Sequence, residues 1–157
     1  MPKPIKRHSS LQPLSRDHHH GLLFCWKIRA GIKRHIEIER LKNHIIWFWN
    51  THLIAHFSEE EEVVFPILEA DHPLVQKALE DHKQLKSLFN ADSFSAHSLD
   101  ELQRKLEEHI RFEERILFNE IQEQASPEQL KLVETHNESG GEEGEYEDDY
   151  WTWDKGN

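Results

Sequence analysis

The sequence lacks the features that define several protein classes. A single cysteine, Cys25, excludes an internal disulfide and a cysteine-rich zinc site. Charged or histidine side chains interrupt every apolar stretch, so no run approaches the roughly 18 uncharged residues of a membrane span. The net charge of −11 provides no basic surface for nucleic acid. We therefore expect neither a membrane protein nor a nucleic-acid-binding one, and the single cysteine fits a reducing, cytoplasmic compartment.

Length and composition divide the chain in two. Residues 1–20 are basic but contain no apolar core, so we do not expect them to be a secretory signal. Residues 1–137 suit one compact domain. From Glu138, eight acidic residues accompany one lysine and few aliphatic side chains, so residues 138–157 are expected to form a disordered acidic tail. Docking of the tail on the domain or on a partner is the alternative, through its aromatic residues Tyr146, Tyr150, Trp151 and Trp153.

Helical periodicity dominates the domain, with little alternation typical of strands. Ser15 and Ser126 are expected N-caps, Ser98 and Glu101 stand in capping-box register, and Pro66 marks a kink or a helix end. The predicted helices span residues 16–34, 37–65, 73–89, 102–124 and 126–136. Four long helices with short connections predict an all-α fold, an up-down-up-down four-helix bundle with a short fifth C-terminal helix and an acidic tail.

Thirteen histidines are the unusual feature of the composition. A 3.6-residue period places at least one histidine in the apolar stripe of each long helix, and His52 shares the stripe of His56. On two helices a glutamate follows one turn later. The stripe of the first of these helices continues to Val63, and that of the second to Ile116 and Leu117. The candidate site residues on these stripes are His18, His56, Glu60, His82, His109 and Glu113. Because buried glutamate is rare unless it is paired or bound to metal, the pattern indicates a metal site.

The spacing of these residues repeats. His56 and Glu60 form an i, i+4 pair, and so do His109 and Glu113, so each helix offers a nitrogen and a carboxylate to the interior. Imidazole and carboxylate donors without thiolate suit two iron ions, with manganese or zinc as alternatives. Without metal, each helix would hold a hydrogen-bonded histidine–glutamate pair, and His82 would bond a backbone carbonyl or Glu107.

Four segments, SRDHHHGL, HFSEEEEVVFP, LEDHKQL and HIRFEERILF, resemble the hemerythrin-like (HHE cation-binding) family over residues 14–124. The resemblance implies a four-helix bundle with a non-haem di-iron centre. His18 and His56 would hold one iron, His82 and His109 the other, and Glu60 and Glu113 would bridge them.

One position departs from the oxygen-carrying members of that family. They have a second histidine one turn after the position of His82, where this chain has Lys86. The departure favours sensing, storage or turnover of iron, oxygen, peroxide or nitric oxide over reversible oxygen transport. His52 could fill the metal-coordination position left vacant by the missing histidine. Ferritin-like carboxylate proteins use the opposite order, Glu-x-x-His, and fit less well.

The remaining histidines are expected to have no role in the site. His19 and His20 are rotated away from the stripe. Expected surface residues are His8, His35, His44, His72, His97 and His136. Glu59 could support a ligand, and Cys25 is expected to be a small buried hydrophobe. A metal-free helical interaction module, in which buried histidines act as a pH switch, is the alternative function.

Overall fold

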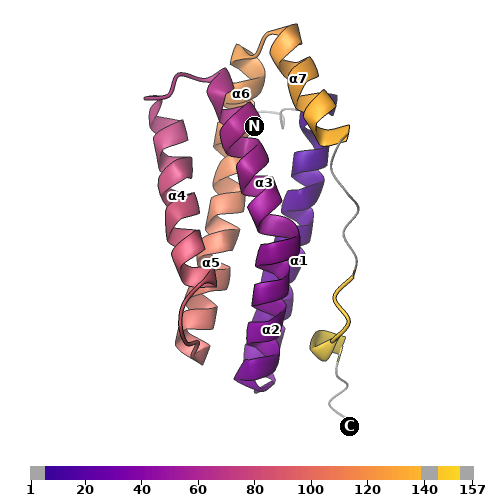
Figure 1. Ribbon diagram of the computed structural model, residues 1–157, viewed down its shortest axis with the longest axis vertical. Coiled ribbons are helices and arrows are strands. Elements are labelled where there is room, and N and C mark those ends of the chain that lie inside the picture. The colour runs from indigo at the N-terminus through magenta and orange to yellow at the C-terminus, as the bar shows by residue number, and fades with distance from the viewer. Residues whose placement is uncertain (1–5, 139–144, 153–157) are drawn as a thin grey trace, which may run out of the picture.

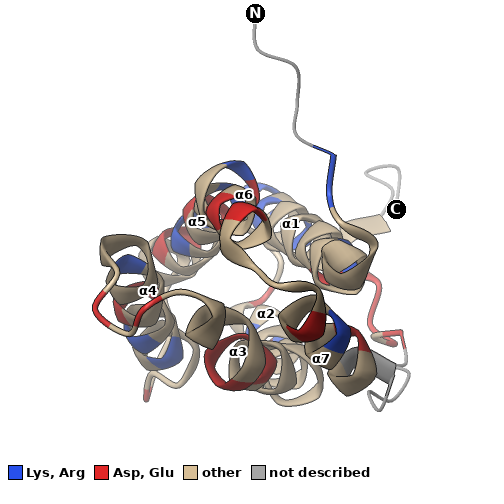
Figure 2. Cartoon of the chain, turned by 90° about the horizontal axis from the view of Figure 1, so that it is seen from above, with Lys and Arg blue, Asp and Glu red and all other residues tan. Residues whose placement is uncertain are grey.

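The computed structural model describes residues 6–138 and 145–152, which are all-helical with no strand. Its α-helices are α1 (Gln12–Lys33), α2 (Ile38–Phe48), α3 (Ile54–Glu59), α4 (Pro73–Phe89), α5 (Ala96–Phe112), α6 (Phe118–Gln124) and α7 (Pro127–Glu138). Four stretches, α1, α2–α3, α4 and α5–α6, lie side by side along the longest axis (Figure 1) and surround the interior when seen from above (Figure 2). None of the described helices has the length and apolar character needed to cross a bilayer.

Three π-helical turns interrupt the helices that the sequence predicts as continuous. They are Trp49–Leu53, Glu60–Val64 and Glu113–Leu117. A π turn contains more residues than an α turn and rotates the following side chains. Val64 is fully buried, Val63 is half-buried against the apolar core, and Ile116 is 50% exposed. The predicted apolar stripe is wrong at Ile116, because it assumes an uninterrupted 3.6-residue period.

Two of the predicted helix starts also differ from the structure. Ser126 caps α7 as expected, since its hydroxyl accepts a backbone N–H of that helix. In contrast, α1 begins at Gln12, and the Ser15 hydroxyl donates instead to the Glu114 carboxylate. The capping box of α5 joins Ser95 and Ser98, one turn before the predicted one.

The apolar core consists of two clusters with the predicted site residues between them. One cluster contains Leu11, Leu14, Val75, Leu117 and Phe118 among others, and α7 adds Val133. The other contains Phe24, Ile45, Phe48, Leu85 and Leu102 among others. Along α1, His18 falls between the two, so a polar layer crosses the middle of an apolar interior.

Residues 145–152 lie against the second of these clusters, whereas the sequence predicts a disordered tail from Glu138. Tyr150 is only 1% exposed, and Tyr146 and Trp151 pack beside it. This segment therefore agrees with the alternative prediction, in which the tail docks on the domain. Trp153 lies outside the described residues.

Candidate metal centre

The structure brings all six predicted site residues together. His18 comes from α1, His56 from α3, His82 from α4 and His109 from α5, while Glu60 and Glu113 are the first residues of two π turns. They form two groups, His18, His56, Glu60 and Glu113, and Glu60, His82, His109 and Glu113. Within each group the ligand atoms lie within 4.8 Å of one another. Because both groups contain Glu60 and Glu113, they form one continuous unit, called here the ligand cluster.

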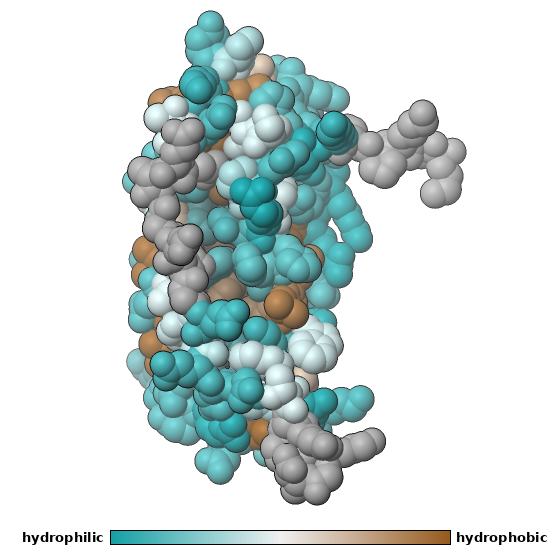
Figure 3. All heavy atoms as spheres, turned by 90° about the vertical axis from the view of Figure 1, so that its right-hand side faces the viewer, coloured by the Kyte–Doolittle hydropathy of each residue, from teal (hydrophilic) through white to brown (hydrophobic). Residues whose placement is uncertain are grey.

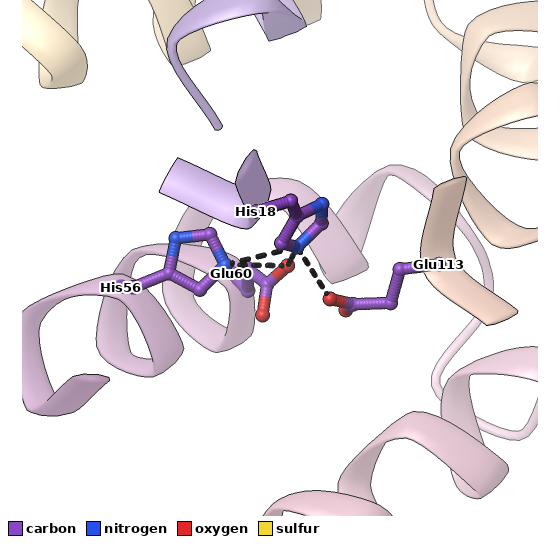
Figure 4. A group of neighbouring side chains, drawn as sticks. All are labelled: His18, His56, Glu60 and Glu113. Atoms are coloured by element: carbon purple, nitrogen blue, oxygen red, sulfur yellow. Dashed lines mark hydrogen bonds and ion pairs between the residues drawn. The ribbon is translucent and has the colours of Figure 1, made fainter. Parts of the chain in front are cut away.

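His18 is at the centre of the first group (Figure 4). Its Nε2 lies 2.9 Å from Glu113 Oε1, 3.2 Å from His56 Nε2 and 3.7 Å from Glu60 Oε2. His56 Nε2 is itself 3.3 Å from Glu60 Oε2. Two imidazole nitrogens therefore face the same pair of carboxylates.

The second group has the same composition and a similar arrangement. His82 Nε2 lies 3.1 Å from Glu60 Oε1, and His109 Nε2 lies 3.2 Å from Glu113 Oε1. Each glutamate thus contacts histidines of both groups. All six side chains are 5% exposed or less, which places the cluster out of contact with bulk water.

Each of the four histidines also has a carboxylate on its outer nitrogen. His18 Nδ1 lies 2.6 Å from Glu114, His56 Nδ1 3.2 Å from Asp17, His82 Nδ1 2.7 Å from Glu61 and His109 Nδ1 3.0 Å from Asp81. An ionised carboxylate only accepts, so each Nδ1 carries the hydrogen and each inward Nε2 keeps its lone pair in the neutral ring. This orientation is the usual one for metal-ligating histidine.

Sequence reasoning did not identify these four carboxylates. Each stands next to a residue of the ligand cluster in the chain but serves a histidine on another helix: Asp17 precedes His18 and bonds His56. The available signal was that each carboxylate neighbours a cluster residue in the chain. Which histidine each carboxylate contacts depends on the tertiary structure. Glu59, the supporting group expected from the sequence, instead lies 3.5 Å from His136.

The electrostatics of the cluster favour added positive charge. Burial opposes protonation of His56, but Glu60 and Asp17 outweigh it and raise its pKa to about 10. Burial likewise opposes protonation of His82, while Glu60 and Glu61 raise its pKa to about 9. The pKa of Glu60 is well below its ordinary value despite burial, because His56, His18 and His82 surround it. Without a metal, protons on the histidines supply the charge that balances the buried carboxylates.

Several polar atoms of the cluster have no hydrogen-bond partner, and such atoms are expected where a cation would bind. Among the described residues, buried atoms without a hydrogen-bond partner include both Glu60 oxygens, Glu113 Oε2 and the Nε2 atoms of His82 and His109. Of these atoms, His82 Nε2 and His109 Nε2 lie 3.1 and 3.2 Å from a carboxylate oxygen of Glu60 and Glu113 without hydrogen-bond geometry. Two nitrogens bound to one cation at roughly 2.1 Å would also lie about 3 Å apart, like His18 and His56. The donor set therefore fits shared cations better than a hydrogen-bond network.

Local backbone structure helps to position the two shared glutamates. Glu60 and Glu113 each follow a regular helical turn that carries the histidine four residues earlier, and each begins a π turn. π turns occur frequently at functional sites. Four residues after each glutamate, Val64 and Leu117 are fully buried in the apolar core.

A small cavity adjoins the first group of the cluster. It has a volume of about 10 Å³, close to the space of one water molecule, and its walls include His18, His56, Gly21 and Ile110. His52 also lines it, although it belongs to neither ligand group and stacks on Phe48. The structure therefore does not place His52 in the vacancy left by the missing histidine.

The remaining sequence expectations have mixed outcomes. Lys86 is exposed and takes no part in the cluster, and His19 and His20 are exposed as predicted. Cys25 is fully buried, and burial raises the pKa of its thiol to about 12, as expected of a structural side chain. The prediction that His44 lies at the surface is wrong, since this residue is 2% exposed.

Comparison of the chain with protein-family models, curated proteins and solved structures gives no match. Functional interpretation therefore rests on the residues and on the geometry described above.

Proposed function

We propose that this chain is a non-haem di-iron protein of hemerythrin type. One observation carries the proposal: two groups of two buried histidines share Glu60 and Glu113, with every inward imidazole held by an outer carboxylate. In this proposal the four long helical stretches form the up-down-up-down bundle of that family. A ferritin-like centre is less suitable, because its glutamates precede its histidines.

The chemistry of the donors supports iron. Four imidazoles and two carboxylates form a nitrogen–oxygen set without thiolate, and such sets suit iron, with manganese and zinc as alternatives. His18 and His56 would hold one ion and His82 and His109 the other. Glu60 and Glu113 would bridge them, since each carboxylate faces both groups.

The chain contributes orientation and exclusion of water to the proposed activity. The outer carboxylates keep the hydrogen on Nδ1 and the lone pair on Nε2, and the two apolar clusters exclude bulk solvent. Bound iron would supply electrons and a position for a small ligand: oxygen, nitric oxide or peroxide. The cavity beside His18, close in volume to one water molecule, adjoins the first group. Because Lys86 is exposed, the second ion would have fewer protein ligands than in the oxygen carriers, which favours sensing, iron handling or turnover.

Metal analysis of the purified full-length chain tests the proposal. We expect about two iron ions per chain and an absorbance difference between anaerobic and aerobic samples. Glu60→Ala and Glu113→Ala should each lose metal from both groups, because each glutamate is shared. His35→Ala is the matched control, since this histidine is exposed and outside the cluster.

Other outcomes separate the competing interpretations. Stoichiometric manganese or zinc would keep the site and change the chemistry. A chain that binds no metal from iron-supplied medium, with histidines that titrate near neutral pH, would contradict the proposal and favour the metal-free pH-switch module. Equal metal content in Glu60→Ala and in the unmodified chain would also contradict it.

A further inference from the structure

The segment of residues 145–152 occupies a groove between α1 and α2 at the end of the molecule away from α7 (yellow in Figure 1). Figure 3 faces this side, where hydrophilic side chains dominate and apolar ones are scattered. The groove is defined here by Lys27 and Gly31 of α1, by Arg34 directly after α1, and by Arg40, Leu41 and His44 of α2. None of these residues belongs to the ligand cluster.

Tyr150 is the central anchor of the segment. Its hydroxyl lies 2.7 Å from His44 Nδ1, and its ring lies against the backbone of α1 at Gly31. A Cβ at Gly31 would come within 3.0 Å of the Tyr150 ring and 2.4 Å of Leu41. The glycine therefore creates the space that the ring fills, so the groove has a shaped pocket for one aromatic side chain.

Two further aromatic rings complete the contact. Tyr146 stacks on His44 with ring centroids 4.2 Å apart, and Trp151 stacks on the same imidazole at 5.5 Å. The Lys27 ammonium lies 4.0 Å from the centre of the Trp151 ring, a cation–π distance. Three aromatic side chains from one short segment thus surround a single histidine.

Charge complementarity adds to the aromatic contacts. The Arg40 guanidinium donates two hydrogen bonds to the Asp148 carboxylate, at 2.9 and 2.6 Å, and Arg34 donates to the backbone oxygen of Trp151. The other acidic residues of the segment, Glu145, Glu147 and Asp149, are exposed. A groove with three basic side chains therefore holds a strongly acidic peptide.

We propose that this groove is a recognition site for acidic peptides of the pattern Tyr-x-x-x-Tyr-Trp, and that residues 145–152 are its built-in, releasable occupant. The segment has one 3₁₀ turn of its own, Tyr150–Thr152, so it is held by side-chain anchors rather than by regular structure. Ordering eight residues opposes docking, while tethering provides an effective concentration of about 1 mM. A partner peptide with the same anchors competes for the same contacts.

Peptide binding to the full-length chain tests this proposal. The probe is a fluorescein-labelled synthetic peptide with the sequence of residues 145–152. A full-length Tyr150→Ser chain, whose own segment has lost its anchor, should bind the probe at least about tenfold more tightly than the unmodified chain. The readout is fluorescence anisotropy, which is independent of metal content and hence of the proposed di-iron function.

Matched controls assign the binding to this groove. A probe carrying Tyr150→Ser should not bind, and a chain carrying both Tyr150→Ser and Arg40→Gln should bind the normal probe about fivefold more weakly, with less dependence on salt. Equal probe affinity of the unmodified and Tyr150→Ser chains, or no binding to either, would overturn the proposal.

Hydrogen exchange of the unmodified chain gives a second, independent answer if Tyr150→Ser fails to fold. The Thr152 amide donates to the Asp149 carbonyl inside the segment. A releasable segment predicts that this amide exchanges at least about a hundredfold faster than the central amides of α1. Equal protection of the two would show that the segment opens only when the whole domain unfolds, which would refute the proposal.

Discussion

The ligand cluster and the α1–α2 groove both bury histidine, but they shift its pKa in opposite directions. In the cluster, burial opposes protonation, yet Glu60 raises the pKa of His56 to about 10 and that of His82 to about 9. In the groove, burial and the Lys27 ammonium together lower the pKa of His44 to about 3, against a small opposing effect of Asp148. Exposure does not distinguish the two sites, since His44 and His56 are 2% and 5% exposed.

The neighbours of each histidine explain this difference. Around the cluster, carboxylates face both nitrogens of every ring, so the site favours protons or cations. Around His44 the neighbours are the rings of Phe24, Tyr146 and Tyr150, so the neutral imidazole acts as a stacking surface and hydrogen-bond partner. Burial of histidine therefore does not by itself indicate a metal ligand; a carboxylate on the outer nitrogen is the better criterion.

The largest expected effect comes from removing the shared carboxylate of the cluster. In metal-free protein, Glu60→Ala leaves three histidines without a common counter-ion and should lower the free energy of unfolding by about 3–5 kcal/mol. His44→Phe keeps an aromatic ring in the groove and should cost about 1 kcal/mol or less. Urea unfolding in the presence of a chelator measures both. A change below 1 kcal/mol for Glu60→Ala would show that the buried charges do not stabilise one another.

The two histidine–glutamate pairs of the cluster could be predicted because a regular helical turn joins each histidine to its glutamate, although the π turn Trp49–Leu53 precedes His56. His56 and His109 precede the π turns, and Glu60 and Glu113 begin them, so all four fall on the predicted inner face. The prediction failed just afterwards at Ile116, where the extra residue of the π turn rotates the helix. The sequence contains no local signal for that change.

Other features depended on contacts between distant parts of the chain. His44 was expected at the surface because its aromatic partners follow about a hundred residues later, in a segment whose acidic composition indicates disorder. The carboxylate on each cluster histidine also comes from another helix, as Asp81 does for His109. The local sequence pattern predicts which face of a helix a side chain lies on, but it does not predict which other helix that face contacts.

Acidification provides the next largest effect, confined to the groove. Docking of residues 145–152 holds the pKa of His44 at about 3, below the ordinary value near 6.5 that we expect after release. Docking is therefore fully favoured above pH 6.5 and weakens as the pH falls toward 3. Between pH 7 and pH 5 the loss should reach about 2 kcal/mol.

The Thr152 amide resonance of metal-free protein, followed by NMR across this pH range, measures the docked fraction. His44→Phe is the matched control, because it keeps an aromatic ring but cannot be protonated, and its docked fraction should stay constant. An identical pH response in both chains would assign the effect to other groups, such as Asp148, which accepts from Arg40.

A smaller effect is expected from the hydroxyl of the central anchor. Tyr150→Phe preserves the ring beside Gly31 but removes the 2.7 Å hydrogen bond to His44 Nδ1. Loss of one such bond should weaken docking by about 1 kcal/mol. The Thr152 resonance again reports the docked fraction, and metal content should not change. Loss of metal in this variant would show that the groove and the cluster are coupled rather than separate.

The smallest effect separates the two roles of Lys27 in the groove. Its ammonium lies over the Trp151 ring, which favours docking, and it also lowers the pKa of docked His44, which makes docking more sensitive to acid. Lys27→Gln should therefore weaken docking at pH 7.5 by about 0.5 kcal/mol, the size of an exposed cation–π contact. It should also reduce the total loss of docking at low pH, because the pKa of docked His44 then lies closer to its ordinary value. An NMR titration of the His44 ring protons measures the second effect directly. If the titration curve does not shift, aromatic burial alone keeps His44 neutral, and the contrast with the carboxylate-lined cluster depends on desolvation rather than on the sign of the neighbouring charge.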